Sequence, residues 1–180
     1  MTVAVDPHQL LKNSTLVYSA SEVESAIDVV THQINQHFKD TPVVMMCVMT
    51  GALYFSAKLL AKLTMPVELD YVQANRYHKN LSGADLVWTK LPTLDLHGKT
   101  VLLVDDILDE GITLQAVYSR CLELGAKVVS TVVLADKLNQ QNKPLKSDFT
   151  ALTVPNLFVF GCGMDAHGWW RNLPEIRAIS

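Results

Sequence analysis

The chain has 180 residues, the length of one ordinary domain. Hydrophobic residues make up 49% of it and charged residues only 18%, against roughly 25% in an average soluble domain, which excludes a collagen-like or disordered chain. The formal net charge is −3, from 15 basic and 18 acidic residues, so no sequence-wide positive field favours a nucleic-acid or anionic-membrane partner.

The cysteine pattern and the N-terminal segment bear on the cellular compartment. Cys47, Cys121 and Cys162 are far apart and form no CxxC spacing, so we expect buried thiols rather than a disulfide framework or a zinc site. The first 15 residues contain no basic segment leading into an apolar one, and the longest apolar run, residues 43–49, is too short to span a bilayer. We therefore expect a cytoplasmic protein with no membrane partner.

The N-terminal part of the chain predicts a helix, a strand and a second helix. Asp6 and Pro7 indicate a helix start, because Asp caps helices and Pro is tolerated at the first helical position. An extended segment at residues 16–18 follows. Residues 21–24, Ser-Glu-Val-Glu, have the capping-box pattern and predict a helix that ends near Phe38.

The middle of the chain alternates in the same way. Residues 42–49 form a predicted strand that is apolar on both faces, which is typical of the centre of a covered parallel sheet. A helix over residues 52–63 and a strand over 67–73 follow. Residues 74–83 are polar and contain breaker residues, so they predict a mobile loop before a strand at residues 85–90.

The second half predicts a strand at residues 100–104, an acidic loop, and a helix from 113 to 124 closed by Gly125. Further strands are expected at residues 128–134, 149–152 and 157–160. The β-α-β-α-β order predicts one α/β domain with a mainly parallel twisted sheet and helices on both faces. In such sheets, ligands bind outside the carboxyl ends of the strands.

The segment VLLVDDILDEGIT, residues 101–113, carries the clearest chemical pattern. An apolar strand ends in Asp105 and Asp106, and Asp109 follows three residues later. The next four residues enter a helix and offer N–H groups and a hydroxyl to an anion; they are Glu110, Gly111, Ile112 and Thr113. Strand side chains alternate between faces, so the two adjacent Asp residues share one role only if the backbone turns there. An Asp-rich turn with an ordinary helix cap would look similar, but three carboxylates gathered beside an anion site favour a cation-dependent function.

This segment resembles the phosphoribosyl-pyrophosphate motif of the type I phosphoribosyltransferases, in which an apolar strand, two acidic residues and two variable positions precede Asp-x-Gly-x-Thr. Downstream features are similar to the hypoxanthine-guanine branch of the family. They are a strand ending in Lys137, an aromatic-Val-x-Gly segment at residues 158–161 followed by Asp165, and an aromatic-Arg pair at Trp170 and Arg171. The resemblance runs from about Pro42 to Ile179.

The resemblance implies a type I phosphoribosyltransferase fold in a single domain. A small hood would be formed by about residues 1–20 and 153–180, and a mobile loop by about 74–84. The implied activity is purine salvage, in which the 5-phosphoribosyl group of phosphoribosyl pyrophosphate (PRPP) passes to hypoxanthine or guanine, giving IMP or GMP and pyrophosphate. The resemblance also implies Mg²⁺ as cofactor and a homodimer or homotetramer.

The resemblance assigns roles in catalysis and metal binding by position. Asp109 would be the general acid or base near N7 of the purine. Asp105 and Asp106 would accept hydrogen bonds from the ribose hydroxyls, directly or through Mg²⁺, and Asp165 would hold a second Mg²⁺ on the pyrophosphate.

It assigns the substrate contacts in the same way. The 5′-phosphate would lie on the four residues 110–113. The purine would contact Lys137, Phe158, Val159 and Asp165, with Lys137 donating to the exocyclic O6. The pyrophosphate would contact Thr50, Gly51, Arg76 and Arg171, and Tyr77 would cover the site from the mobile loop.

Three positions depart from the family's pattern. Glu110 stands where many members have Thr, so backbone N–H groups and Thr113 would have to hold the phosphate. Thr50 stands where Lys is frequent, in a loop that in the family contains a non-proline cis peptide bond. Arg76-Tyr77 is the nearest match to the Ser-Tyr pair of the family's mobile loop.

These residues also admit other interpretations. Taken singly, Lys137 reads as a solvated lysine, Phe158 as core and Asp165 as a turn former. A phospho-receiver domain would need its acidic pair near the N-terminus, but 104 residues precede Asp105. A dinucleotide fingerprint at residues 161–166 leaves only 17 residues after Gly163, too few for the rest of a βαβ unit. The remaining alternative is a PRPP-sensing regulator of RNA or DNA on the same fold.

Overall fold

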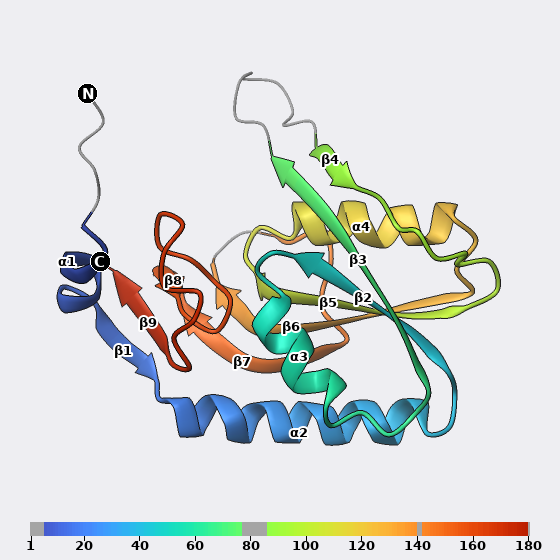
Figure 1. Cartoon of the computed structure of the whole chain (residues 1–180), viewed down its shortest axis with the longest axis horizontal. Coiled ribbons are helices and arrows are strands. Elements are labelled where there is room, and N and C mark those ends of the chain that lie inside the picture. The colour runs from blue at the N-terminus through green and yellow to red at the C-terminus, as the bar shows by residue number, and fades with distance from the viewer. Residues whose placement is uncertain (1–5, 77–85, 140–141, 180) are drawn as a thin grey trace.

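The computed structural model describes residues 6–76, 86–139 and 142–179, which form a large and a small β-sheet (Figure 1). The elements in the first half are α1 (Pro7–Lys12), β1 (Thr15–Tyr18), α2 (Ala20–Phe38), β2 (Val43–Met49), α3 (Leu53–Leu60), β3 (Val67–Arg76) and β4 (Leu86–Lys90). Those in the second half are β5 (Thr100–Leu108), α4 (Ile112–Glu123), β6 (Val128–Leu138), β7 (Phe149–Pro155), β8 (Phe158–Phe160) and β9 (Ile176–Ile179).

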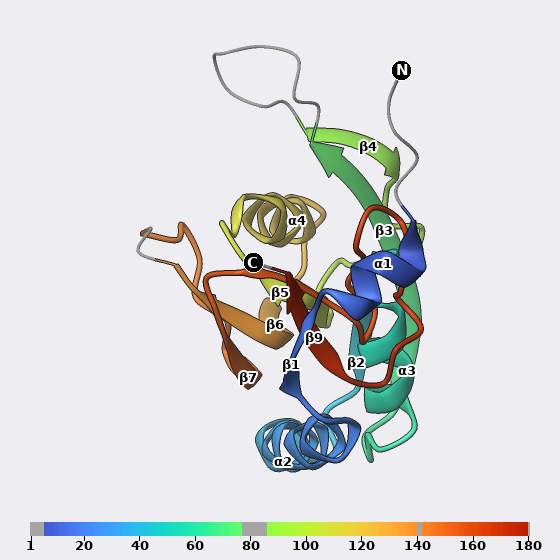
Figure 2. The same cartoon turned by 90° about the vertical axis from the view of Figure 1, so that its left-hand side faces the viewer.

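The large sheet has the strand order β4-β3-β2-β5-β6-β7. Every neighbouring pair in it is parallel except β3 and β4, which are antiparallel at one edge. Helices α2 and α3 cover one face and α4 covers the other, as Figure 2 shows for α2 and α4. This arrangement confirms the predicted mainly parallel sheet flanked by helices.

Alternation along the central strands builds a core on each face of the large sheet. In β5, Leu102 and Val104 pack on the side of α2 and α3, while Val101 and Leu103 pack on the side of α4. Strands β2 and β6 contribute to both cores in the same way. The continuous apolar runs in the sequence therefore reflect burial on both faces.

The small sheet joins the two ends of the described chain. Its order is β1-β9-β8, and both pairs are antiparallel. Arg177 in β9 donates to the Ser14 hydroxyl at 2.7 Å, and the Trp170 ring N–H donates to the Pro7 carbonyl at 2.7 Å. Neither β9 nor its pairing with β1 was anticipated, because β9 is four residues long and its residues carry no marked alternation.

Several predicted boundaries were wrong. Helix α2 is capped by Ser19 with Glu22, not by Ser21 with Glu24, because the capping-box pattern occurs twice and the earlier one forms both reciprocal bonds. Helix α3 is shorter than expected. Strand β3 continues to Arg76, into the segment predicted as a loop, because β4 pairs with it there.

Strands β5 and β6 also run past their predicted ends, because parallel pairing between them continues as far as Leu108 and Asp136. The three cysteines are free and buried, as expected. Within residues 6–76, 86–139 and 142–179, no helix is long and apolar enough to cross a membrane.

Candidate active site

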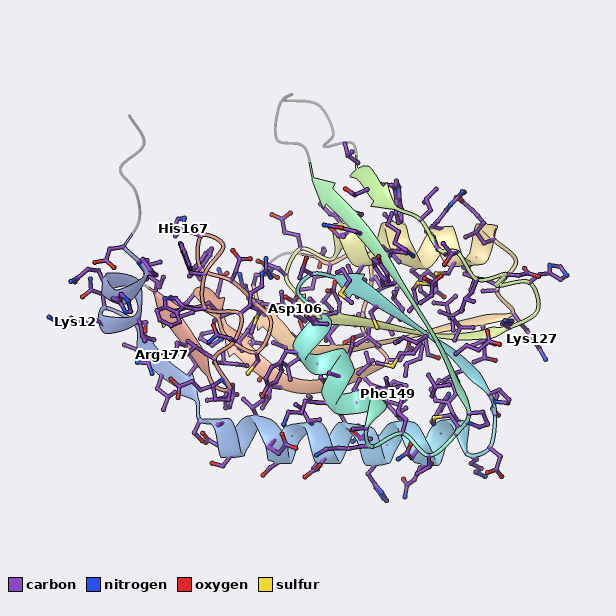
Figure 3. The ribbon with its side chains drawn as sticks, viewed as in Figure 1. Lys12, Asp106, Lys127, Phe149, His167 and Arg177 are labelled. Carbon is purple, nitrogen blue, oxygen red and sulfur yellow. The ribbon has the colours of Figure 1, made fainter. Side chains whose placement is uncertain are left out.

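The acidic segment lines a pocket of about 440 Å³ at the carboxyl end of β5. Its lining consists of Asp105, Asp106, Ile107, Asp109, Glu110, Gly111, Ile112, Thr113 and Leu114. In Figure 3, Asp106 lies near the middle of the molecule, on the side of the large sheet that faces the small one. The pocket therefore occupies the edge at which ligands of parallel sheets bind.

The backbone of β5 turns at the two adjacent carboxylates. Up to Val104, alternate residues face alternate cores, but Ile107 packs on the side of α2 and α3 and Leu108 on the side of α4, which reverses the alternation. The N–H of Asp106 donates to Asp105 Oδ1 at 2.9 Å, and the N–H of Ile107 donates to Asp106 Oδ1 at 2.8 Å. This turn meets the condition under which both carboxylates can serve one site.

Burial and mutual repulsion act on the pair. Asp105 is only 8% exposed, and burial together with the neighbouring charge of Asp106 raises its pKa well above the usual value. Burial also raises the pKa of Asp106, although the nearby Arg171 charge opposes the shift. Two hard oxygen donors held close together in this way fit a divalent cation such as Mg²⁺, which binds to one or two carboxylates and completes its shell with phosphates and water.

Two glycines bring the loop after β2 against Asp106. A Cβ atom at Gly51 would lie 2.0 Å from Asp106 Oδ2, and one at Gly163 would lie 2.0 Å from the Gly51 carbonyl oxygen. Gly163 also has φ of 102°, which favours glycine. The bond between Met49 and Thr50 is a non-proline cis peptide, in the loop where the family resemblance implies one.

Asp109 contacts the end of β6. Lys137 Nζ lies 2.5 Å from Asp109 Oδ2, and the Asn139 side-chain amide donates to Asp109 Oδ1 at 3.1 Å and to its carbonyl at 3.0 Å. The Lys137 side chain is mostly buried. Asp109, the predicted acid/base, and Lys137, the predicted O6 donor, therefore contact each other directly.

The start of α4 forms the other wall of the pocket. Gly111 has φ of 78° and precedes Ile112, the first residue of the helix; because glycine has no side chain, this N-cap residue leaves the first N–H groups of α4 without a side-chain cap. The first-turn N–H groups of a helix attract anions. Residues 110–113 therefore surround a space suited to a phosphate.

Asp165 and Arg171 form a separate pair in the segment between β8 and β9. Their closest atoms are 2.5 Å apart, and Arg171 Nη1 donates to the Gly163 carbonyl at 2.7 Å. Asp165 also accepts the Gly168 N–H at 2.6 Å. In the part of the chain that the structure describes, no three His, Cys, Asp or Glu side chains cluster as a metal site, so Asp165 is not grouped with Asp105 and Asp106.

The remaining predicted residues are dispersed. Phe158 is half exposed on β8, and Val159 beside it is buried. Thr50 lies in a second pocket, of about 460 Å³, whose lining also includes Gly163 and Arg171. Arg76 is the last residue of β3, whereas Tyr77 and the rest of the predicted mobile loop lie outside the described residues.

Sequence reasoning missed Asn139, Lys143 and Gly163. Lys143 donates to the carbonyls of Leu108 at 2.7 Å and Lys137 at 2.6 Å, so it ties the ends of β5 and β6 together. Asn139 directly follows Leu138, the last residue of β6, a position that could have marked it as lying at the same edge of the sheet as Lys137.

Comparison with known proteins agrees with this geometry. The family model described as phosphoribosyl transferase domain matches residues 15–167. The chain belongs to the phosphoribosyltransferase family. It is 30% identical over 170 residues to the hypoxanthine-guanine phosphoribosyltransferase of Aquifex aeolicus, covering 93% of this chain and 96% of the relative. It is 28% identical over 165 residues to the hypoxanthine-guanine-xanthine phosphoribosyltransferase of Tritrichomonas foetus, covering 91% and 90%.

A solved structure supports the same conclusion for this phosphoribosyltransferase. The hypoxanthine phosphoribosyltransferase of Trypanosoma cruzi superimposes with a TM-score of 0.87 at 25% identity, covering 94% of this chain and 97% of that one. The predicted family and fold class are confirmed. All these relatives are transferases, so the regulatory alternative gains no support from them.

Proposed function

We propose that this protein transfers the 5-phosphoribosyl group of PRPP to hypoxanthine or guanine, giving IMP or GMP and pyrophosphate, as a step of purine salvage. The observation that carries the proposal is the contact between Asp109 and Lys137 beside the pocket of residues 105–114. The two side chains would supply an acid/base and a cation beside a site suited to a sugar phosphate, which supports the proposal.

The edge of a 6-oxopurine matches this pair. Guanine presents N7 and O6 next to each other on one edge. Lys137 would donate to O6, and Asp109 would face N7. Because adenine carries an amino group at the 6-position, a lysine there would favour the oxopurines.

The remaining purine contacts come from the small sheet, which we propose as the hood of a single-domain enzyme. The exposed ring of Phe158 would stack on the base, and the Val159 backbone would read its edge. Asp165 and Arg171 would lie toward the pyrophosphate, with Thr50, Gly51 and Arg76 on its other side. Tyr77 would cover the site from the mobile loop.

The phosphoribosyl group would be held by the acidic segment. Asp105 and Asp106 would bind the ribose hydroxyls and Mg²⁺, and residues 110–113 would hold the 5′-phosphate through N–H groups and the Thr113 hydroxyl. When bound, Mg²⁺ neutralises charge on the pyrophosphate. Asp165 would contribute to a second Mg²⁺ only if its pairing with Arg171 opened.

The reaction breaks the bond from C1′ to the pyrophosphate oxygen and forms the bond from C1′ to N9. Positive charge develops on the purine as N9 attacks, and the Asp109 carboxylate would accept the proton from N7. Arg171 would stabilise the charge that develops on the leaving pyrophosphate.

The test is an assay of hypoxanthine, guanine, xanthine and adenine, each with PRPP and Mg²⁺. We expect turnover of hypoxanthine, guanine or both, and little with adenine. The matched variant is Lys137→Met, which keeps an unbranched side chain without the terminal ammonium group and should selectively weaken use of the 6-oxopurines. No turnover of any base while PRPP still binds would favour the regulator, and equal losses for every base in Lys137→Met would contradict the role of Lys137.

We further propose a homodimer or homotetramer. Four exposed apolar side chains of α3 and β3 line one shallow pocket of about 320 Å³; they are Leu53, Leu60, Leu69 and Tyr71. Such a patch is typical of an interface. Sedimentation as a monomer at micromolar concentration would contradict the assembly.

The free cysteines support a reducing compartment, which we propose to be the cytoplasm.

A further inference from the structure

A two-residue hairpin turn projects from the segment between β8 and β9. Ala166 and Trp169 exchange both backbone hydrogen bonds, at 2.9 and 3.0 Å. The central residues, His167 and Gly168, have φ of 53° and 89°. Positive φ at both central positions identifies a type I′ turn. Figure 3 shows His167 on this loop, at the end of the molecule that carries the small sheet.

Histidine adopts positive φ more often than most residues, but it is not one of the residues preferred at this position. The first central position of a type I′ turn prefers Asn, Asp or Gly, because other side chains crowd the backbone in the left-handed region. The turn is otherwise well fixed, since Asp165 accepts the Gly168 N–H and pairs with Arg171. A strained residue on a firmly held turn points to a role for its side chain.

The side chain of His167 has one ring partner among the described residues. Its imidazole stacks on the ring of Phe158, with the ring centroids 6.1 Å apart and the planes inclined by 18°. Phe158 belongs to β8, nine residues earlier, and its ring is 50% exposed. His167 therefore limits rotation of the partly exposed Phe158 ring.

We propose that His167 is a positioning residue of the purine subsite. By stacking on Phe158, it fixes the plane of that ring and leaves the remaining exposed surface of the ring to stack on the base. This inference rests on the proposed function, since it takes Phe158 as the base platform. The firmly held turn, through Asp165 and Arg171, then links the orientation of the platform to the residues proposed near the pyrophosphate.

This role predicts that loss of the His167 ring weakens binding of the base and leaves binding of the other substrate unaffected. An aromatic pair contributes about 0.5–1.5 kcal/mol beyond its buried area, which corresponds to about 2- to 12-fold in affinity. Loss of the His167 ring should raise KM for hypoxanthine or guanine within that range. KM for PRPP and kcat should change less than about two-fold, because His167 is not among the residues that line the pocket of Asp109 and residues 110–113.

Two variants separate the effect of the His167 ring from the effect of the turn conformation. His167→Asn removes the ring but suits the type I′ turn, so its melting temperature should not fall. His167→Tyr keeps a planar ring in the same strained position. We expect His167→Asn to raise KM for the base and His167→Tyr to stay within about two-fold of the unchanged enzyme.

Calorimetric titrations with GMP and with ribose 5-phosphate complete the test. His167→Asn should weaken GMP binding and leave ribose 5-phosphate binding unchanged, because only GMP carries the base. An unchanged base KM in an active His167→Asn variant, or equal losses in both variants, would overturn the role of His167 while the proposed function stands. If the enzyme without substitutions transfers the phosphoribosyl group to no base, the proposed function is overturned. If, in that case, His167→Asn also binds GMP with unaltered affinity, the role of His167 is overturned as well.

Discussion

Two carboxylate sites of similar burial differ in what surrounds them. Asp70 on β3 is 6% exposed, and Asp105 at the end of β5 is 8% exposed. Asp70 accepts the N–H groups of Thr93 at 2.6 Å and Leu94 at 3.0 Å, and Lys90 Nζ lies 2.9 Å away. Asp105 instead accepts the N–H of Asp106 at 2.9 Å, and the side chain of Asp106 beside it carries a like charge.

The two environments shift the pKa values of the carboxyl groups in opposite directions. Burial alone would raise the pKa of Asp70, but hydrogen bonds from Leu94, Lys90 and Thr93 together lower the pKa well below the usual value. For Asp105, burial and the charge of Asp106 both raise the pKa. The chain thus satisfies Asp70 by itself, whereas the described residues give the acidic pair only a partial counter-charge, from Arg171 near Asp106, and a bound cation would supply the rest. The partners of the two carboxylates, rather than their burial, therefore distinguish Asp70 from the proposed ligand-binding residue Asp105.

The largest effect is expected at Asp109, where the proposed role is chemical. Asp109→Asn should lower kcat by roughly 10² to 10⁴, with little change in KM for PRPP, because the amide cannot accept a proton from N7. Steady-state kinetics with hypoxanthine and guanine measure the effect. A stability measurement is the control, since Asp109 contacts Lys137 and Asn139. Full activity in Asp109→Asn would remove this residue from the mechanism.

Breaking the Asp70 site should damage the fold and spare the chemistry. Asp70→Asn should lower the free energy of unfolding by about 2 to 4 kcal/mol at pH 7, because Lys90 and several N–H groups lose a charged acceptor. Urea unfolding measures the loss, and kcat at a temperature where the variant is folded should stay within about two-fold. A large fall in kcat without loss of stability would contradict this division of roles.

The loss of unfolding free energy in Asp70→Asn should depend on pH in a defined direction. The pKa of Asp70 is lowered in the folded state, so its stabilising contribution is complete above the unfolded-state pKa of about 4. As the pH falls below that value, the unfolded state takes up a proton first and the contribution declines toward the folded-state pKa. The stability difference between the unchanged protein and Asp70→Asn should therefore shrink below about pH 4. A difference that grows on acidification would exclude this account.

The same contrast explains which features the sequence could predict. Asp105, Asp106 and Asp109 end an apolar strand before a helix, so local order alone predicted their pocket. Besides the N–H of the adjacent Tyr71, the partners of Asp70 lie 20 to 24 positions later, and no local pattern indicates those. Likewise β9 forms because β1, more than 150 residues earlier, pairs with it. Long-range pairing also overrode the local signals that would have ended β3 and β5 sooner.

Removing one member of the acidic pair should have the opposite effect from the change at Asp70. Asp105→Asn takes away one of two neighbouring buried charges, so the ligand-free protein should gain about 1 to 2 kcal/mol at neutral pH. The added stabilisation by PRPP with Mg²⁺ should be largely lost. Thermal unfolding with and without PRPP and Mg²⁺ measures both effects, and Asp70→Asn, which should keep its ligand stabilisation, is the control. Destabilisation of the ligand-free protein by Asp105→Asn would show that the pair serves the fold.

The smallest effect should come from an exposed ion pair, although its atoms are closer than those at Asp70. Lys99 Nζ and Glu68 Oε2 lie 2.5 Å apart, against 2.9 Å for Lys90 and Asp70, but their side chains are 36% and 57% exposed. Water and salt screen such a pair, so Glu68→Gln should change the free energy of unfolding by less than about 1 kcal/mol, and less still in high salt. Urea unfolding at two salt concentrations measures this. If Glu68→Gln lost as much unfolding free energy as Asp70→Asn, the distance between the charges would determine how much each carboxylate stabilises the fold. Burial and the number of hydrogen bonds would then not determine it.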